Sequence, residues 1–326
     1  MEGFIIHQNR EIHLCTLFDE NYAMQGLTMI NSVGRYGTHN VIWHVLALSD
    51  NCYDALRKSN MNINLYGIGD ILDTNLHEIV TNRKWSEFCY AAGPIFLHFL
   101  SNQLSDSHIL GYVDSDCFFF NDIMLGLRPF NNDCEIQIHE HRYSLDRLMW
   151  LGKSGRFNVG LVIGILGNTY RECLARWRLQ VIADSSVNEH KGTCGDQMYL
   201  NEWPLLYKSL KIIPSHGIGL APWNLNSTKI SKKDQIFFAD NDPLIFYHFH
   251  GLEIFYANRW IKIWSSAPGY KFNNKDHIRI YKAYIHKLVK YRNDLEKLFS
   301  IRISPINLKK LVRLIATFQL QISFFN

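Results

Sequence analysis

Short runs of β-branched and aromatic residues alternate with helical stretches between residues 12 and 250, and this alternation constrains the fold more than any other feature. It is typical of βα units that build a mostly parallel sheet. The expected strands cover residues 12–18, 41–48, 109–113, 135–138, 159–163 and 244–249, and the expected helices cover 22–35, 52–60, 87–103, 168–183 and 196–202. We therefore predict an α/β fold with a mostly parallel central sheet flanked by helices.

No internal repeat and no Pro- or Gly-rich linker divides the first 270 residues, so we expect a single domain over residues 1–270. Residues 271–326 differ in charge: they carry 12 Lys/Arg and 3 Asp/Glu, a net charge of +9, whereas the whole chain carries +4. Residues 276–298 and 306–325 have helical spacing. The expected organisation is one domain followed by a basic amphipathic helical extension.

The second helical piece of this extension has an apolar stripe with basic residues beside it. The stripe consists of Leu308, Leu311, Val312, Ile315, Phe318 and Ile322, and the basic residues off it are Lys309, Lys310 and Arg313. Three interpretations fit this pattern: a terminal helix packed on its own domain, a contact in a homo-oligomer, or a helix that rests on an anionic membrane surface.

The composition excludes several classes of protein. With 47% hydrophobic and 20% charged residues, the chain is typical of a globular protein and not of a low-complexity one. It has no run of 18 apolar residues, and its first residues lack the basic start and apolar core of a secretory signal. Its seven cysteines form no CxxC pair, which favours reduced thiols. We expect a cytoplasmic protein, attached at most to the inner face of the membrane, that binds no nucleic acid.

Two carboxylates, Asp114 and Asp116, directly follow the expected strand at 109–113. Residues two apart in an extended chain project to the same side, so both carboxylates can reach one divalent ion. They lie at the carboxyl end of a strand, where open α/β sheets bind their ligands. Hard oxygen donors favour Mn²⁺ or Mg²⁺, which also bind substrate phosphates. The pair is therefore a candidate metal site.

This segment and four others, in matching order, resemble a known enzyme family. Residues 112–120 (YVDSDCFFF) are similar to the DxD signature of GT-A-fold glycosyltransferases, which bind a nucleoside-diphosphate sugar through a divalent metal. Four segments resemble motifs of the family 8 glycosyltransferases: 16–33 (TLFDENYAMQGLTMINSV), 157–160 (FNVG), 195–204 (GDQMYLNEWP) and 247–252 (YHFHGL). The resemblance implies that the predicted domain is a GT-A catalytic domain with a Rossmann-like sheet.

The resemblance also implies which residues bind the donor. In that family the first segment holds the nucleotide base, which carries over to Asp19, Asn21 and Tyr22, with Thr16 as a neighbour. The Asn158 region would line the pocket of the donor sugar. A UDP-sugar is the favoured donor, because an Asp can accept from a uracil N–H and an aromatic ring can stack on the base. The alternative is that Asp19 caps a helix and Tyr22 packs in the core.

The same resemblance assigns the reacting centre. Asp196 and Gln197 would contact the donor sugar near its anomeric carbon, although a helix N-terminus also explains an Asp at this point. The family's H-x-x-G motif supplies the third metal ligand, and Gly251 selects His248 for this role. His250 lies on the same face of an extended strand and is the reserve. The implied metal ligands are thus Asp114, Asp116 and His248.

Two loops and two departures complete the candidate site. Trp223 and Asn224 lie in a glycine-containing loop and either contact sugars or plug the loop. His139, Glu140, His141 and Arg142 follow another strand and are reserve candidates, with solvent-facing loop residues as the alternative. The lysine that follows H-x-x-G in the family and contacts the diphosphate is absent here, so Arg259 or Lys262 is the candidate for that contact. The family also has an arginine before the DxD motif, and Lys84 is the candidate that replaces it.

The sequence therefore predicts a metal-dependent glycosyltransferase that moves a sugar from a nucleoside-diphosphate sugar to a hydroxyl of a glycan or lipid-linked acceptor in the synthesis of surface polysaccharide. The resemblance favours retention of the anomeric configuration. An inverting enzyme would need a carboxylate base, for which Glu140 is the candidate. Two other classes stay open: a sugar-nucleotide pyrophosphorylase, and a non-catalytic carbohydrate-binding protein on a transferase fold.

Overall fold

The computed structural model describes residues 10–36, 40–59, 61–71, 79, 81–256, 261–265, 275–299 and 320–324. The helices are α1 (Ala23–Tyr36), α2 (Asp50–Arg57), α3 (Ile68–Ile71), α5 (Trp85–Ser101), α6 (Leu151–Ser154), α7 (Asn168–Ala183), α8 (Trp203–Leu206) and α9 (Lys275–Phe299). The longer strands are β1 (Ile12–Phe18), β2 (Val41–Ala47), β3 (Asn64–Gly67), β4 (Ile109–Val113), β6 (Ile136–Glu140), β7 (Phe157–Ile165), β11 (Ile230–Lys233), β12 (Ile236–Ala239), β15 (Glu253–Tyr256), β16 (Ile261–Ser265) and β17 (Leu320–Phe324). The shorter strands are β5 (Cys117–Phe119), β8 (Val187–Asn188), β9 (Thr193–Cys194), β10 (Leu210–Ile212), β13 (Asp242–Pro243) and β14 (Phe246–His248).

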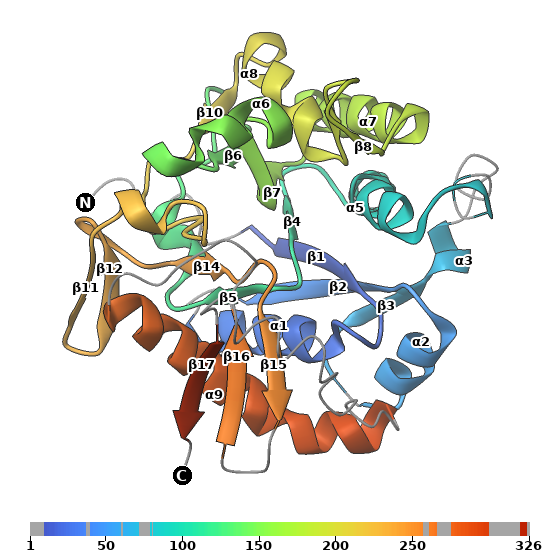
Figure 1. Cartoon of the computed structure of the whole chain (residues 1–326). Helices are drawn as coiled ribbons and strands as arrows, with labels where there is room; N and C mark the ends of the chain where they lie inside the picture. The colour runs from blue at the N-terminus through green and yellow to red at the C-terminus, as the bar shows by residue number, and fades with distance from the viewer. Residues whose placement is uncertain are drawn as a thin grey trace.

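Seven strands form the central sheet, in the order β10-β6-β7-β4-β1-β2-β3 (Figure 1). β7 runs antiparallel to both of its neighbours, β4 and β6, and the other adjacent pairs are parallel. The strands predicted at 12–18, 41–48, 109–113, 135–138 and 159–163 all lie in this sheet. The prediction of a mostly parallel α/β fold is therefore confirmed.

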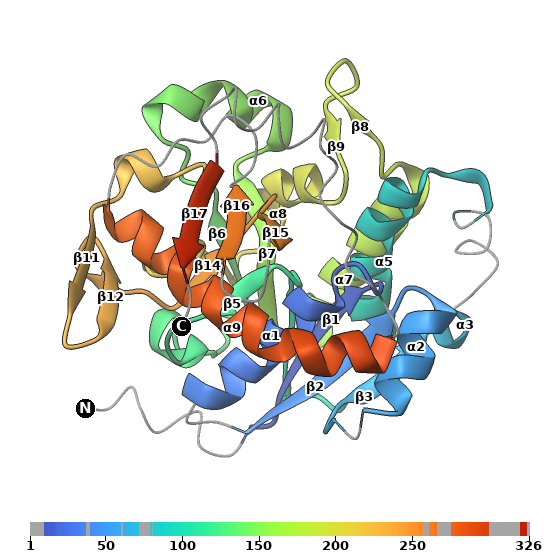
Figure 2. The same ribbon diagram turned by 60° about the horizontal axis from the view of Figure 1, so that its bottom comes forward.

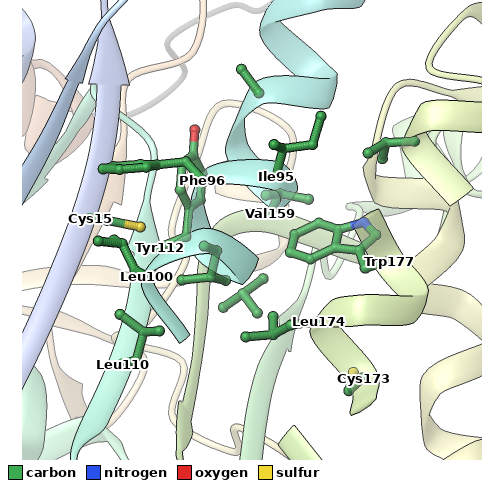
Figure 3. Close-up of a cluster of buried hydrophobic side chains, with 14 of the residues drawn as sticks. Cys15, Ile95, Phe96, Leu100, Leu110, Tyr112, Val159, Cys173, Leu174 and Trp177 are labelled. Carbon is green, nitrogen blue, oxygen red and sulfur yellow. The ribbon is translucent and has the colours of Figure 1, made fainter. Parts of the chain in front are cut away.

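Helices cover both faces of the sheet, as Figures 1 and 2 show from two directions. α5 and α7 lie on one face, and their apolar side chains form a buried cluster with residues of β1, β4 and β7. The cluster includes Trp177 of α7, Leu110 of β4 and Val159 of β7 (Figure 3). α1 and α2 cover the other face, where Leu27 and Leu56 pack against the sheet. Because both faces are covered, β1 and β4 are buried at every position, as expected for inner parallel strands.

The strand predicted at 244–249 is shorter than expected and lies outside the central sheet. The strand that forms there, β14, pairs antiparallel with β5 in a two-stranded sheet beside the end of β4. The reason is a tight turn after β4, in which the Cys117 N–H donates to the Asp114 carbonyl at 3.1 Å and redirects the chain into β5. His248 pairs with Cys117 in this ladder, next to the turn that carries both aspartates.

The helix predicted at 276–298 is confirmed as α9, which lies across α1 and α2 (Figure 2). Tyr281, Tyr284 and Leu288 are fully buried in a cluster that includes Phe118 and Tyr247. Each such side chain contributes roughly 1.5–3 kcal/mol when it leaves water. In the described part of the chain, no helix combines the length and the apolar character that crossing a membrane requires.

The helix predicted at 306–325 is wrong at its end. Residues 306–319 lie outside the described residues, but β17 is a strand that pairs antiparallel with β16. Ile322, assigned to the apolar helical stripe, therefore belongs to a sheet. The sequence LQISF also alternates apolar and polar residues with a period of two, which favours a strand over a helix.

Acid should weaken the packing of α9 through His277. Its ring is buried, neither ring nitrogen has a partner among the described residues, and burial lowers its pKa to about 4. An unfolded histidine titrates near 6.5, so this contribution is complete above pH 6.5 and is lost as the pH falls to about 4. We expect the native protein to lose on the order of 2 kcal/mol of unfolding free energy from this group over that range.

Urea denaturation at pH 7 and pH 4.5 measures the effect. His277→Phe should lose less stability than the native protein on acidification. His286→Phe, a change at an exposed position of the same helix, should behave like the native protein. Equal acid losses in the His277 variant and the native protein would contradict the account.

Candidate functional site

The chain turn after β4 brings the two predicted metal-binding aspartates to the carboxyl edge of the parallel strands. The backbone N–H of Asp114 donates to the Gly160 carbonyl of β7 at 3.4 Å. The hydroxyl of Tyr112, two residues earlier on β4, donates to Asp114 Oδ1 at 3.0 Å. The buried strand thus fixes the orientation of the carboxylate that follows it.

β14 brings His248 to the same point. His248 Nε2 lies 2.9 Å from Asp116 Oδ1 and 3.8 Å from Asp114 Oδ2, and the His248 side chain is almost fully buried. The structure therefore brings together the three residues that the sequence predicted as metal ligands. The reserve candidate, His250, is exposed, and its ring lies 5.8 Å from that of His248.

The hydrogen bonds of His248 indicate that a cation fits among these groups. Asn158 Oδ1 accepts from the Gly160 N–H at 2.9 Å, and His248 Nδ1 lies 3.2 Å from the same oxygen. Nδ1 must therefore donate its hydrogen, so Nε2 directs either a second proton or a lone pair at the two carboxylates. This arrangement of three acceptors needs a proton or a metal ion between them, and an outer ring N–H held by a protein oxygen is typical of metal-bound histidine.

Electrostatics support the same conclusion. Burial alone would raise the pKa of Asp116, but the charge and hydrogen bond of His248 lower it below its usual range. Burial alone would lower the pKa of His248, but the two aspartates raise it. Burial and the nearby Asp116 raise the pKa of Asp114, against the effect of His248. Two carboxylates therefore share the one imidazole, and a divalent ion would supply the second positive charge.

Cys117 also lies within 4.8 Å of ligand atoms of Asp116 and His248. Its thiol donates to the Gly160 carbonyl at 3.7 Å. Burial and the two neighbouring aspartates raise its pKa well above the usual range, so the thiol stays protonated. A protonated thiol is a poor metal ligand, which leaves the oxygen donors and His248.

Asn158 connects the metal candidates to the predicted sugar-binding residues. Its Nδ2 donates to Gln197 Oε1 at 3.4 Å and lies 3.3 Å from His141 Nε2. Asp196 precedes a 3₁₀ helix, Gln197–Glu202, so the helix predicted at 196–202 is one of tighter pitch. Asp196 thus lies at the N-terminus of a short helix, as the alternative expected, but its side chain makes no capping hydrogen bond to that helix. Burial, followed by the charge of Asp114, raises the Asp196 pKa well above its usual range and favours a protonated carboxyl.

The predicted loop residues, Trp223 and Asn224, are buried beside the candidate metal ligands. Trp223 is 5% exposed, and its ring meets the ring of His248 edge-on at 5.2 Å. Asn224 is buried and donates to the carbonyls of His141 and Gly219, which supports the loop-plug interpretation. Trp223 therefore fixes the imidazole of His248.

Of the residues predicted to bind the nucleotide base, Tyr22 is exposed and Thr16 is buried. Asp19 accepts from the N–H groups of Asn21 and Tyr22, at 2.9 and 3.3 Å, before α1 begins. Tyr22 is 49% exposed, so the alternative that placed it in the core is wrong. Thr16 is fully buried in β1. The ring of Tyr22 is thus exposed enough to stack on a base.

The reserve residues at the end of β6 and just after it differ from their solvent-facing alternative. His139 and His141 are buried, and Arg142 donates to the carbonyls of Ser215 and Ile218. The side chain of Glu140, the candidate base of an inverting enzyme, forms an ion pair with Arg156.

The predicted phosphate-binding cations are less well placed. Lys84 is exposed just before α5. Arg259 lies outside the described residues, and only the backbone of Lys262 is described.

Sequence reasoning missed Tyr112 and Tyr90. Tyr112 and Asp114 share a face two residues apart, a spacing that could have revealed the contact. Tyr90 of α5 packs against Gly195, whose φ of +58° favours glycine and where a Cβ would lie 2.8 Å from the Tyr90 ring. This explains the glycine before Asp196. No local pattern connects residue 90 with residue 195.

Gly160 should be essential for the position of His248. A Cβ at this residue would lie 2.6 Å from Asn158 Oδ1 and 3.0 Å from His248 Nδ1. Gly160→Ala is expected to break the bond between these two side chains and to weaken Mn²⁺ affinity by about tenfold or more. Gly152→Ala, where nothing lies within 4 Å of the added carbon, is the control. Calorimetric Mn²⁺ titration that finds equal affinity in both variants would refute this role.

Comparisons with known proteins give relatives and similar structures. No family model matches the chain. It is 27% identical to YfnD of Bacillus subtilis strain 168 over 295 residues, covering 88% of this chain and 92% of that protein, and 26% identical to YfnF of the same organism over 256 residues, covering 75% and 82%. Both carry the name uncharacterized protein.

Similar solved structures include the galactosyltransferase LgtC in complex with donor and acceptor sugar analogues and mouse xyloside xylosyltransferase 1. LgtC has 16% sequence identity and a TM-score of 0.48, covering 86% of this chain and 99% of LgtC. The xylosyltransferase has 13% identity and a TM-score of 0.47, covering 74% of this chain and 98% of that one. The fold described above rests on the strand order and register of this chain itself.

Proposed function

We propose that the protein is a metal-dependent glycosyltransferase that moves a sugar from a nucleoside-diphosphate sugar to an acceptor hydroxyl. The observation that carries the proposal is the convergence of Asp114, Asp116 and the Nε2 of His248 at the carboxyl edge of the parallel strands. The side-chain amide of Asn158 connects this centre to Gln197, because its Oδ1 contacts His248 Nδ1 and its Nδ2 donates to Gln197 Oε1. A metal site and a polar sugar site side by side are what transfer from a nucleotide sugar requires.

Each residue has a defined task in this proposal. Asp114, Asp116 and His248 would hold Mn²⁺ or Mg²⁺, which when bound neutralises the charge that grows on the leaving diphosphate. Tyr22 offers its exposed ring to the base. Asp196 and Gln197 would contact the hydroxyls of the donor sugar, and a protonated Asp196 can donate a hydrogen bond there. Their position supports retention over inversion, because the candidate base Glu140 is paired with Arg156.

A panel of sugar nucleotides tests the function. The purified protein is incubated with each donor and Mn²⁺, with and without added glycans, and release of nucleoside diphosphate is measured. We expect release from at least one donor, stimulated by an acceptor and abolished by EDTA. Formation of nucleoside triphosphate from pyrophosphate would instead indicate a pyrophosphorylase. Donor binding without any turnover would indicate a carbohydrate-binding protein.

We also propose that the acceptor is a glycan on a lipid, reached through the basic extension. The support is the charge of residues 271–326 together with the stripe at 308–318, which lies outside the described residues. Each basic residue near an anionic surface contributes roughly 1 kcal/mol. Deleting the extension would remove β17, so substitution is the better test.

Replacing Lys309, Lys310 and Arg313 together with serine is expected to reduce co-sedimentation with anionic vesicles by tenfold or more at low salt, where three such contributions are lost. Release of nucleoside diphosphate in solution should be unchanged. The control is a triple change of the exposed Lys208, Lys232 and Lys233 to serine. Equal vesicle binding by the two triple variants would contradict a role for the extension.

A further inference from the structure

A second group of side chains of the types that bind metals lies at the opposite end of the central strands. Glu11 precedes β1, His13 lies on β1, and His108 precedes β4. Ile12 pairs with Ile109, and the Ile109 N–H donates to the Glu11 carbonyl at 3.0 Å. Because side chains alternate along a strand, Glu11 and His13 project to the same face. His108 and Asp114 are six residues apart along an extended chain, so the two groups are separated by about 20 Å.

The three side chains converge on one point. Glu11 Oε2 lies 3.4 Å from His13 Nε2 and 3.6 Å from His108 Nδ1. The two rings stack with centroids 5.1 Å apart and planes 8° apart, and the three ligand atoms all lie within 4.8 Å of one another. His108 Nδ1 is buried and makes no hydrogen bond within the described part of the chain. A buried nitrogen that faces a carboxylate and has no hydrogen bond is suited to bind a metal ion.

A second layer of side chains fixes the ring of His13. His13 Nδ1 lies 2.9 Å from His44 Nε2, and His44 Nδ1 lies 3.3 Å from the Tyr66 hydroxyl. If His13 donates from Nδ1 to His44, its Nε2 lone pair faces Glu11. This is the arrangement of a histidine that binds a metal through one nitrogen and a protein partner through the other.

We propose that Glu11, His13 and His108 form a second metal site, for a transition metal of the Zn²⁺ type, that links the starts of β1 and β4. Two imidazoles and one carboxylate suit Zn²⁺ and its neighbours, whereas the oxygen-rich pair after β4 suits Mn²⁺ or Mg²⁺. Three protein ligands leave a fourth position for water. The site lies away from the proposed sugar site, so it stabilises the sheet.

Co²⁺ is the probe, because its visible absorption reports the coordination by nitrogen and oxygen. The full-length protein is stripped with a chelator and titrated in an Asp116→Asn background, which weakens the site after β4. We expect about one equivalent of Co²⁺ to bind and to be displaced by Zn²⁺. Adding His108→Gln should lower the affinity at least tenfold, and adding His190→Gln, at an exposed histidine, should not change it. Zn²⁺ should raise the thermal midpoint of the parent and the His190 variant but not of the His108 variant.

Glu11→Gln keeps the test decisive if the His108 variant does not fold. The Glu11 side chain is 58% exposed, so its replacement leaves the core intact. It should also lower Co²⁺ affinity at least tenfold and remove the thermal response to Zn²⁺. Unchanged Co²⁺ affinity in the Glu11 variant would overturn the proposal and leave Glu11 and His108 as an ordinary ion pair.

Discussion

Asp116→Asn is expected to lower donor turnover by about 10³-fold or more, because loss of a charge that holds a catalytic ion costs several kcal/mol of transition-state stabilisation. The protein should stay folded. Asparagine has the same size as aspartate, and its amide N–H can donate to the Nε2 lone pair of His248, which lies 2.9 Å from the carboxylate in the native protein. The unfolding free energy should change by no more than about 1–2 kcal/mol. Release of nucleoside diphosphate and thermal unfolding measure the two effects.

Asp133→Asn is the matched control, since Asp133 is exposed. It should leave both turnover and stability unchanged. Turnover of Asp116→Asn within a few-fold of the native value would show that the ion, if one is used, binds elsewhere. A large loss of stability would show that the Asp116 carboxylate mainly holds the fold.

His248→Ala is expected to weaken Mn²⁺ affinity by about 100-fold, whereas His250→Ala should weaken it less than about tenfold. The two histidines should differ in their effect on Mn²⁺ affinity because they lie at different distances from the aspartates. The Nε2 of His248 faces both aspartates, and its other nitrogen is held by Asn158. His250 is exposed and contacts the site through the rings of His248 and Trp223. Even partners that only orient a ligand contribute about 10- to 100-fold to metal affinity.

Calorimetric titration of Mn²⁺ into both variants decides between the two histidines. His248→Gln is a useful third variant, because it keeps a polar side chain in the buried position but lacks the imidazole. It should bind Mn²⁺ as weakly as His248→Ala. A larger loss of affinity in His250→Ala would show that the ligand lies two residues further along the chain.

Much of the fold could be predicted because its inner strands are apolar and regular. β1, β4 and β7 are almost entirely buried, so their sequences are mostly apolar. The short edge strands β3 and β10 are partly exposed and carry polar residues, and their sequences resemble loops. The sequence predicts helix at β17 because LQISF follows a stretch with helical spacing. A strand of only five residues forms because it pairs with β16, and that pairing cannot be seen in the local sequence.

The candidate site could be predicted to the extent that its residues share local motifs. Asp114 and Asp116 follow from their spacing after a strand, and His248 follows from the resemblance to the H-x-x-G motif; the structure brings the three together. The central position of Asn158 could not be predicted, because its partners come from β14 and from the segment before α8. The burial of Trp223 likewise depends on the rings that surround it.

The most direct test of the central claim is the contact between a bound metal ion and the donor diphosphate. In a solution of the protein, Mn²⁺ and a nucleoside diphosphate that the protein binds, the paramagnetic ion shortens the relaxation times of phosphorus nuclei near it. We expect the native protein to enhance phosphorus-31 relaxation of both phosphates, and the Asp116→Asn protein to give no more than the enhancement seen without protein. Equal enhancement by the two proteins would contradict a metal site formed by Asp114, Asp116 and His248.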